Sequence, residues 1–381
     1  MTDEKSIWKR AWESFFLFLK IGATSFGGPA ASTAIIQHET VEKRKWLTHE
    51  HFLDLLAAVN LVPGPNSTEM AIHVGFTHAG WPGLILSGAA FIFPAFLISL
   101  ALAWVYTRFG SLPQVSALFY GINPAVLAII LTACYRLWKS AVKGWVAALA
   151  AGVCFAASLL GVDEVIILLA AGAFGVLISG QALKLALLPL PLYLPMAAPL
   201  LIEAASDKLV RMGLFFLKVG ALLFGSGMVL FAFIQRDVVE TFGWLSQQQL
   251  IDAIAVGQMT PGPVLSSATF IGYLVAGLPG ALVATIGVFL PSFLIVAFLG
   301  FLIPRLQKNP LAKAFLKGVN LAVVALILSV CVSLARSAVI DLPSLLIFAV
   351  ALLALLRFKV DAPWVVVGGA LLGLARLLLG Y

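Results

Sequence analysis

The chain has 381 residues, of which 61% are hydrophobic and 11% are charged, and its mean hydropathy is +1.05. A soluble domain carries about 25% charged residues. This composition therefore excludes a soluble protein and predicts an all-α polytopic membrane protein, whose spanning helices each need about 20 mainly apolar residues. The net charge of +7 is what the positive-inside rule produces, so the expected surroundings are a lipid bilayer, with no nucleic-acid partner.

The start of the chain and its cysteines predict neither processing nor a metal site. Residues 1–13 mix both charge signs and lack a small-residue cleavage site, so we expect no removable signal peptide. Cys134, Cys154 and Cys331 lie in apolar runs without the spacing of metal ligands, which predicts free thiols packed in the core. We expect no cofactor.

Apolar segments follow one another along the chain in two sets of six. The first set covers residues 12–36, 52–77, 83–107, 115–138, 144–160 and 164–180, and the second covers 209–234, 249–275, 280–303, 313–335, 342–356 and 362–380. Between them lies Leu183–Ile202, which is apolar but holds four prolines. We therefore predict an N-terminal membrane repeat over 1–180, a proline-rich connector over 181–207 and a C-terminal membrane repeat over 208–381.

The two sets are copies of one another. Residues 18–65 align with 216–263 without a gap, and 19 of the 48 positions are identical. After one residue is dropped, matched glycines, prolines and asparagines continue to Asn123 and Asn320. A membrane chain that duplicates lysine, glycine and proline inside apolar segments is typical of a transporter that builds one site from two halves.

Loop charges predict that the two repeats are inverted. In the first repeat the loop after the third segment has one basic residue and the loop after the fourth has three, whereas the second repeat shows the reverse. If lysine and arginine stay cytoplasmic, equivalent loops lie on opposite sides of the membrane. This requires an odd number of crossings between the repeats, so we expect the connector to span and predict 13 spans, with 12 as the alternative, and a cytoplasmic N-terminus. In this topology Lys43-Arg44-Lys45 lies on the outer side of the membrane, against the positive-inside rule, unless the first segment is re-entrant.

Each repeat breaks its first helix with glycine. The first copy reads Ser25-Phe26-Gly27-Gly28-Pro29, and the second reads Leu223-Phe224-Gly225-Ser226-Gly227. Broken helices at membrane depth survive only where protein or a water-filled cavity satisfies the freed backbone groups, and the N-terminus of a half-helix attracts anions. Lys20 and Lys218 precede the breaks at equivalent positions. A lysine inside an apolar segment costs about 2.5–3.5 kcal/mol, so we expect either snorkelling to the interface or a role in binding a divalent anion.

A second break follows in each repeat, at Pro63-Gly64-Pro65 and Pro261-Gly262-Pro263. Pro-Gly-Pro ends a helix, and the polar residues after it can cap the restarted half or donate hydrogen bonds to a ligand. These residues are Asn66, Ser67 and Thr68 in the first copy, and Ser266 and Ser267 in the second. Glu69, whose counterpart is Ser267, is the candidate for proton coupling; the alternative is a structural partner for Lys20 or for His73 on the same helical face.

Other polar positions have mainly structural interpretations. Asp54 and Asp252 match between the repeats and are expected near a helix N-terminus, where the helix dipole favours them. Asn123 and Asn320 are expected to line the site or to bond helices together. The sequence has no Walker A, GxSxG or HExxH motif, so ATP hydrolysis and metal-centred catalysis lack their residues, and we expect no enzyme.

This set of motifs resembles the chromate ion transporter family in its long, two-domain form. The resemblance rests on residues 18–29, Trp46-Leu47 and residues 63–69, followed by the second-half breaks, and it covers essentially the whole chain. Two positions depart from the usual pattern, with Ser32 in place of histidine and Lys20 in place of arginine. The resemblance implies proton-driven chromate efflux across the bacterial plasma membrane, conferring chromate resistance, with sulfate as the chemical look-alike.

We therefore predict a secondary transporter whose partners are a small inorganic anion, protons and the bilayer, with a homodimer left open. Lys20 and Lys218 would supply positive charge, and Gly27, Gly28 and Gly225 would supply backbone N–H donors. The polar residues of both breaks would supply side-chain donors, namely Ser25, Asn66, Ser67, Thr68, Ser226, Ser266 and Ser267. Glu69 would carry the proton. The alternatives are a sulfate or other anion transporter or exchanger and, from another class, a membrane enzyme of lipid-linked substrates.

Overall fold

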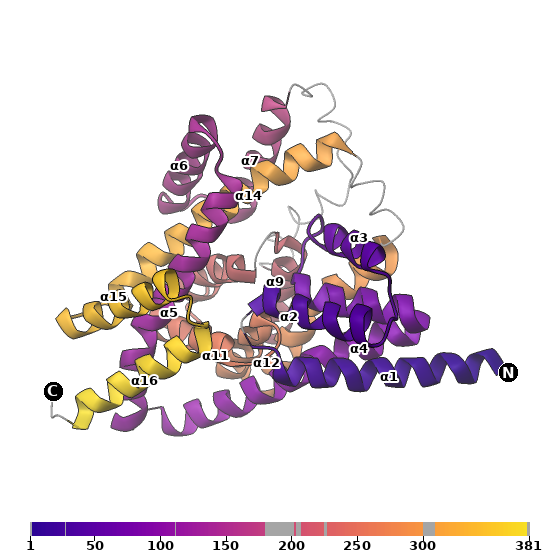
Figure 1. Cartoon of the computed structure of the whole chain (residues 1–381). Coiled ribbons are helices and arrows are strands. Elements are labelled where there is room, and N and C mark those ends of the chain that lie inside the picture. The colour runs from indigo at the N-terminus through magenta and orange to yellow at the C-terminus, as the bar shows by residue number, and fades with distance from the viewer. Residues whose placement is uncertain are drawn as a thin grey trace. The chain divides into compact units, whose positions relative to one another are not determined.

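The computed structural model of the chain describes residues 2–26, 28–110, 112–179, 202, 207–224, 227–299 and 309–378. Every regular element among these residues is helical, which confirms the predicted all-α class (Figure 1). Four of the helices found in this part of the chain are long and apolar enough to cross a membrane, namely Asn66–Phe109, Pro113–Ala141, Val264–Phe298 and Pro310–Ala338. The predicted span in the connector, apart from Ile202, lies outside the described residues.

The elements of the two repeats follow the same order. The first repeat forms α1 (Thr2–Thr24), α2 (Gly28–Gln37), the π-helix η1 (His38–Lys43), α3 (His49–Val59), α4 (Asn66–Phe109), α5 (Pro113–Ala141), α6 (Trp145–Leu159) and α7 (Glu164–Ile178). The second forms α9 (Lys208–Leu222), the 3₁₀-helix η4 (Gly227–Val229), α10 (Leu230–Phe233), the π-helix η5 (Ile234–Thr241), α11 (Gln247–Met259), the 3₁₀-helix η6 (Val264–Ser266), α12 (Ser267–Leu294), the π-helix η7 (Ile295–Leu299), α14 (Pro310–Ala338), α15 (Leu342–Arg357) and α16 (Ala362–Leu378).

Helix α4 consists of two arms joined at a sharp bend. A straight helix of its 44 residues would be about 66 Å long, against a hydrocarbon thickness of about 30 Å. The backbone leaves the helical region at Ala79 and Gly80, and Gly80 has φ 62° and ψ −147°, a conformation that glycine adopts far more easily than other residues. A Cβ on Gly75 would lie 2.4 Å from the carbonyl oxygen of Gly83, so the two arms fold back on one another.

Helix α12 repeats this hairpin in the second half of the chain. Gly277 has φ 63° and ψ −152°, and a Cβ on Gly272 would lie 2.3 Å from the carbonyl oxygen of Gly280. The sequence predicts a boundary between apolar segments at each of these glycines, between 52–77 and 83–107 and between 249–275 and 280–303, and the bends at Gly80 and Gly277 confirm both boundaries. The small residues are needed because the two arms approach within backbone contact.

The chain divides by its contacts into two compact units, and each unit draws on both repeats. The first unit comprises Met1–Ala101, Tyr193–Gly227 and Thr260–Pro310, and the second comprises Leu102–Leu192, Met228–Met259 and Leu311–Tyr381. The repeats predicted over 1–180 and 208–381 are defined by sequence similarity, whereas these two units are defined by which residues contact one another. Both predicted pairs of helix breaks fall mainly in the first unit.

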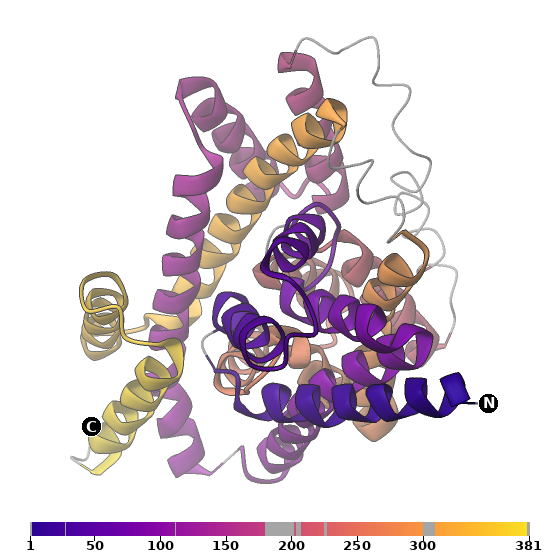
Figure 2. The ribbon, with the colours of Figure 1, turned by 45° about the vertical axis from the view of Figure 1, so that its right-hand side comes forward.

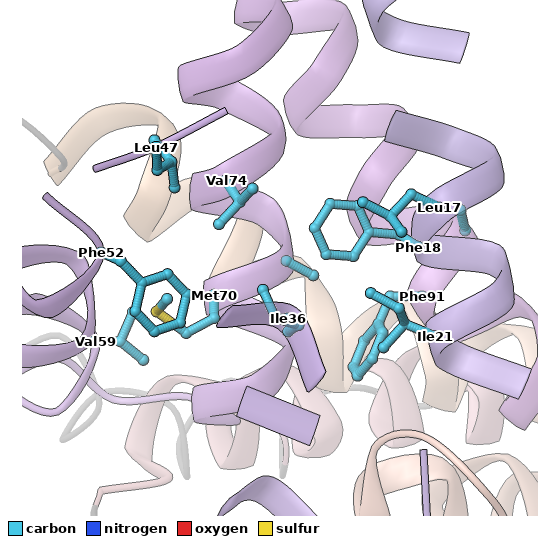
Figure 3. Close-up of a cluster of buried hydrophobic side chains, with 12 residues drawn as sticks. Leu17, Phe18, Ile21, Ile36, Leu47, Phe52, Val59, Met70, Val74 and Phe91 are labelled. Carbon is cyan, nitrogen blue, oxygen red and sulfur yellow. The ribbon is translucent and has the colours of Figure 1, made fainter. Parts of the chain in front are cut away.

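An apolar cluster lies in the part of the first unit that the first repeat contributes (Figure 3). It joins α1, α2, α3 and both arms of α4 around fully buried side chains such as Phe18, Phe52, Met70 and Phe91. Burying a side chain of this size stabilises the fold by roughly 1.5–3 kcal/mol where water is the reference. The helices that flank the first repeat's breaks therefore share one apolar core.

The second unit is built on α5 and α14, which occupy equivalent positions in the two repeats and lie side by side (Figure 2). The thiol of Cys134 on α5 lies 3.6 Å from the carbonyl oxygen of Val324 on α14. Helix α16 packs on α5, where a Cβ on Gly121 would lie 1.9 Å from the Gly369 carbonyl oxygen. In the same way α7 packs on α14, where a Cβ on Gly318 would lie 1.9 Å from the carbonyl oxygen of Ala171. The last helix of each repeat thus packs on a long helix of the other.

Candidate functional site

The glycine break of the first repeat meets the Pro-Gly-Pro break of the second. Helix α1 ends at Thr24 and α2 begins at Gly28, which has φ 80°. The carbonyl oxygen of Ser25, between these helices, accepts a hydrogen bond of 2.9 Å from the backbone N–H of Gly262. This bond satisfies a carbonyl that the broken helix would otherwise leave without a partner.

The same bond occurs a second time with the repeats exchanged. The backbone N–H of Gly64 donates to the carbonyl oxygen of Leu223 over 2.8 Å. In the repeat alignment Gly64 corresponds to Gly262, and Leu223 corresponds to Ser25. Such reciprocal contacts are the signature of a twofold relation between two bodies. The two copies of the predicted break pair therefore lie together and satisfy one another's backbone.

Glycines packed against backbone support both breaks in the same symmetrical manner. A Cβ on Gly22 in α1 would lie 2.4 Å from the carbonyl oxygen of Phe91. A Cβ on Gly220 in α9 would lie 2.3 Å from the carbonyl oxygen of Val288. Because Gly22 aligns with Gly220 and Phe91 with Val288, the helix before each break docks in the same way on its own hairpin.

Three of the predicted donor hydroxyls are buried without a hydrogen-bond partner among the described residues. They are Ser25, Thr68 and Ser266, of which the last two are equivalent in the repeats. A buried hydroxyl without a partner costs free energy, so this group is what a polar ligand would satisfy. Of the other predicted donors, Ser267 donates to the carbonyl oxygen of Val264 over 3.1 Å, and Asn66 donates to Asn60 over 2.7 Å.

The remaining predicted residues of the breaks are placed as follows. Ser67 is buried, and Pro29 lies in the first turn of α2. Pro63, Gly64 and Pro65 separate α3 from α4, as Pro261, Gly262 and Pro263 separate α11 from η6. Gly27, Gly225 and Ser226 lie outside the described residues.

Glu69 lies fully buried in the first arm of α4, beside the Pro-Gly-Pro break. Neither of its carboxylate oxygens has a hydrogen-bond partner among the residues that the structure describes. His73, four residues further along, is also buried, and its Nε2 atom has no partner there either. Isolated buried carboxyl groups are costly and mark functional positions in membrane proteins.

The two lysines that occupy equivalent positions in the repeats have different surroundings. The Lys20 ammonium bonds the carboxylate of Glu39 over 3.3 Å, and 60% of its side chain is exposed. Lys43 and Arg44 bind the same carboxylate, so the structural partner of Lys20 is Glu39. Lys218 is buried, with 6% of its surface exposed, and it has interactions of its own.

Glu39 was missed by the sequence analysis, although its counterpart Asp237 is also acidic. Burial raises the pKa of the Glu39 carboxyl and the hydrogen bonds from Arg44 and Lys20 lower it, so that its pKa lies below the usual value. Lys20 and Glu39 are 19 residues apart, which a straight helix would separate by about 28 Å. Their contact therefore shows that the chain turns sharply at the first break.

In the second unit, Asp252 is a buried acid with a full set of donors. The Tyr106 hydroxyl donates to it over 2.7 Å, the Gln248 amide over 3.0 Å and the Asn123 amide over 3.2 Å. These groups line a cavity of about 250 Å³. A larger cavity of about 490 Å³ contains the ion pair of Glu164 and Arg236. Neither cavity is lined by a residue of the breaks. Asp252 lies in the second turn of α11, so side-chain donors satisfy it where the helix dipole was predicted to do so.

Long apolar helices, a duplicated set of elements and paired helix breaks define a multi-pass membrane protein with two internal repeats. The model of the chromate transporter family matches residues 12–176 and again residues 210–374. The chain belongs to the chromate transporter family, with two copies of its domain in one polypeptide.

Curated relatives match nearly the whole chain. A chromate transport protein of Cupriavidus metallidurans is 36% identical over 373 residues, which cover 94% of this chain and 91% of that protein. A probable chromate transport protein of Synechococcus elongatus is 35% identical and covers 93% of both chains. An uncharacterised transporter of Bacillus subtilis is 28% identical over 134 residues, which are 35% of this chain and 75% of that protein. No solved structure matches the chain.

Proposed function

We propose that this protein is a secondary transporter that exports chromate across the bacterial plasma membrane, driven by protons, and thereby confers chromate resistance. The relatives named as chromate transport proteins, which cover more than nine-tenths of the chain, support the substrate. The observation that carries the mechanism is the reciprocal pairing of the helix breaks. A site assembled from two related halves is the common arrangement of secondary transporters, in which one part rocks against another.

The repeats are inverted about an axis in the membrane plane. The reciprocal bonds of Gly64 and Gly262 support a twofold relation, and the opposite loop charges of the repeats favour inversion over a parallel repeat. If the connector crosses the membrane, this topology has 13 membrane crossings and a cytoplasmic N-terminus. The alternative topology has 12 crossings. The sharp turn between Lys20 and Glu39 supports a re-entrant first segment, which would place Lys43-Arg44-Lys45 on the same side as the Lys20 ammonium.

The anion binds at the paired breaks. Backbone N–H groups at Gly27, Gly28 and Gly225 would meet its oxygens, together with side-chain donors from both breaks, listed as Ser25, Asn66, Ser67, Thr68, Ser226, Ser266 and Ser267. The unsatisfied state of three of these hydroxyls supports this assignment. Lys218, which is buried, supplies positive charge from within the unit, and Lys20 supplies it from the ion cluster with Glu39. Hydrogen bonds to a charged ligand are the strong ones, and a tetrahedral dianion can accept several of them.

Glu69 carries the coupling proton. Its burial and its lack of a partner among the described residues favour a neutral acid that ionises only when the site changes its access to water. The structural alternative required Lys20 or His73 as the partner, and Lys20 is bound to Glu39 instead. Because export is driven by the inward proton gradient, the proton that Glu69 carries moves inward while the anion moves outward.

The test is flux of radiolabelled chromate and sulfate in proteoliposomes with an imposed pH gradient. We expect chromate flux that the gradient accelerates and that sulfate inhibits weakly. Absence of flux for both anions would contradict the transport proposal, and equal or faster sulfate flux would favour the second candidate, a sulfate transporter or exchanger. Flux that is unchanged in Glu69→Gln would remove the proton role alone. Normal transport by the double variant Lys20→Ala/Lys218→Ala would show that neither lysine is needed to bind the anion.

A further inference from the structure

The two Pro-Gly-Pro breaks are bonded alike but have different surroundings. A Cβ built on Gly64 would lie 2.1 Å from Oε1 of Glu69 and 2.9 Å from Oγ of Ser292. A Cβ built on Gly262 would instead meet the Gly22 carbonyl oxygen at 3.1 Å and the Ala95 Cβ at 3.4 Å. The small space beside Gly64 is therefore lined by a carboxyl and a hydroxyl group.

This difference is a substitution at two matched positions. Ser292 on α12 aligns with Ala95 on α4, and Glu69 on α4 aligns with Ser267 on α12. One break thus has a carboxyl group with a hydroxyl beside it, and the other has a hydroxyl and a methyl group. Because Glu69 and Ser292 come from different repeats, this polar pair forms only when the hairpins of both repeats are assembled.

The hydroxyl of Ser292 is not used elsewhere in the described part of the chain. Its side chain is fully buried, and its Oγ has no hydrogen-bond partner there. Serine and threonine in helices commonly donate to the carbonyl four residues earlier, as Ser32 does to Gly28 and Thr285 does to Ala281. Ser292 makes no such bond, so its donor remains available beside the Glu69 carboxyl, which is equally unsatisfied.

We propose that Ser292 is a positioning residue for Glu69, whose hydroxyl donates to the carboxylate when Glu69 releases its proton to water on the open side of the site. The inference rests on the proposed proton role of Glu69. Other titratable groups on the elements next to this break are His73 and His78 on the same arm of α4, four groups on α3 and three on α9, namely His49, Glu50, His51 and Asp54, and Lys208, Arg211 and Lys218. The Ser292 hydroxyl is a donor that borders the Glu69 carboxyl across Gly64.

The test is the pH dependence of chromate flux in proteoliposomes for matched variants. Hydroxyl donors favour an ionised carboxylate over a neutral acid, so Ser292→Ala should move the pH of half-maximal flux upward by about 0.5–1 unit. Ser292→Thr keeps the hydroxyl and should retain most of the wild-type midpoint. Ser87→Ala removes an equally buried and unpaired hydroxyl of α4 and should leave the midpoint unchanged. The mirror variant Ala95→Ser adds a hydroxyl beside Gly262 and should also leave it unchanged.

The outcomes separate the inference from the function on which it rests. If Glu69→Gln abolishes the pH dependence while Ser292→Ala keeps the wild-type midpoint, the role of Ser292 is overturned and the proton role of Glu69 stands. An equal shift in Ser292→Ala and Ser87→Ala would also overturn it, because the effect would then come from hydroxyl loss in general. If Glu69→Gln keeps the pH dependence, the proton role fails, and the inference fails with it.

Discussion

Alanine at the two equivalent Pro-Gly-Pro glycines should have unequal effects on transport. Gly64 and Gly262 have φ angles of 149° and 87°, which L residues rarely adopt, so either substitution should cost about 1–3 kcal/mol of backbone strain. The further contacts differ. At Gly262 the nearest atom to the new methyl group is a backbone oxygen at 3.1 Å, a tight contact that a shift of a few tenths of an ångström relieves.

At Gly64 the new methyl group would overlap the Glu69 carboxylate, with Oε1 at 2.1 Å and Cδ at 2.7 Å. The end of a flexible side chain moves more easily than the backbone, so the overlap should be relieved by displacing the carboxylate. Both variants should therefore lose similar stability in thermal unfolding in detergent, but only Gly64→Ala should lose the pH dependence of flux. Gly277→Ala, where φ is 63° and nothing lies within 4 Å of the new Cβ, controls for strain alone. Equal loss of pH dependence in Gly64→Ala and Gly262→Ala would refute the reasoning.

Three other substitutions test the packing and electrostatics around the site. Gly22→Ala places a methyl group 2.4 Å from the Phe91 carbonyl oxygen and should destabilise the protein by about 1–3 kcal/mol or more, whereas Gly152→Ala, with open space around it, should not lower the stability in the same thermal-unfolding assay, because alanine favours a helix more than glycine does. Asp252→Asn exchanges an acceptor of three donors for an amide and should cost about 1–3 kcal/mol, and full stability would contradict the hydrogen-bond assignment. The pKa of Glu39 in the folded protein lies below its usual value, so the ionised carboxylate stabilises the fold at pH values above that usual pKa, and this stability is lost as the pH falls through the folded pKa. Glu39→Gln should lack this loss of stability in acid. Identical profiles of stability against pH for the wild type and Glu39→Gln would contradict the prediction.

The sequence was sufficient to locate the breaks but could not pair them. Pro63-Gly64-Pro65 must end a helix for local reasons, and its duplication indicated a shared site. The bond between Gly64 and Leu223 joins residues from different repeats, and nothing in either local pattern encodes that partner. The alignment shows which residues of the two repeats are equivalent. Once one of the two bonds is known, exchanging the equivalent residues therefore suggests the other bond.

The roles of individual side chains were less predictable, because they depend on contacts that spacing does not specify. Ser292 follows a matched proline within an apolar run, where a serine alone indicates little, and only its position beside Gly64 gives it significance. Glu39 lies outside the breaks, and its bond to Lys20 depends on the sharp turn between them. The bends at Gly80 and Gly277 were predictable by contrast, because each glycine lies between two predicted apolar segments, and two consecutive spans require the chain to reverse between them.

The central claim is that the paired breaks bind the anion, and equilibrium binding of chromate to the purified protein tests it most directly. The triple variant Ser25→Ala/Thr68→Ala/Ser266→Ala removes the three unsatisfied hydroxyls of the breaks. The control Ser14→Ala/Ser87→Ala/Ser99→Ala removes three hydroxyls of the first unit that are equally buried and equally without partners among the described residues. Each lost hydrogen bond to a charged ligand should weaken binding about tenfold. We predict a Kd raised by about 10²–10³-fold in the first variant and unchanged in the control, and equal Kd values in the two variants would contradict the claim.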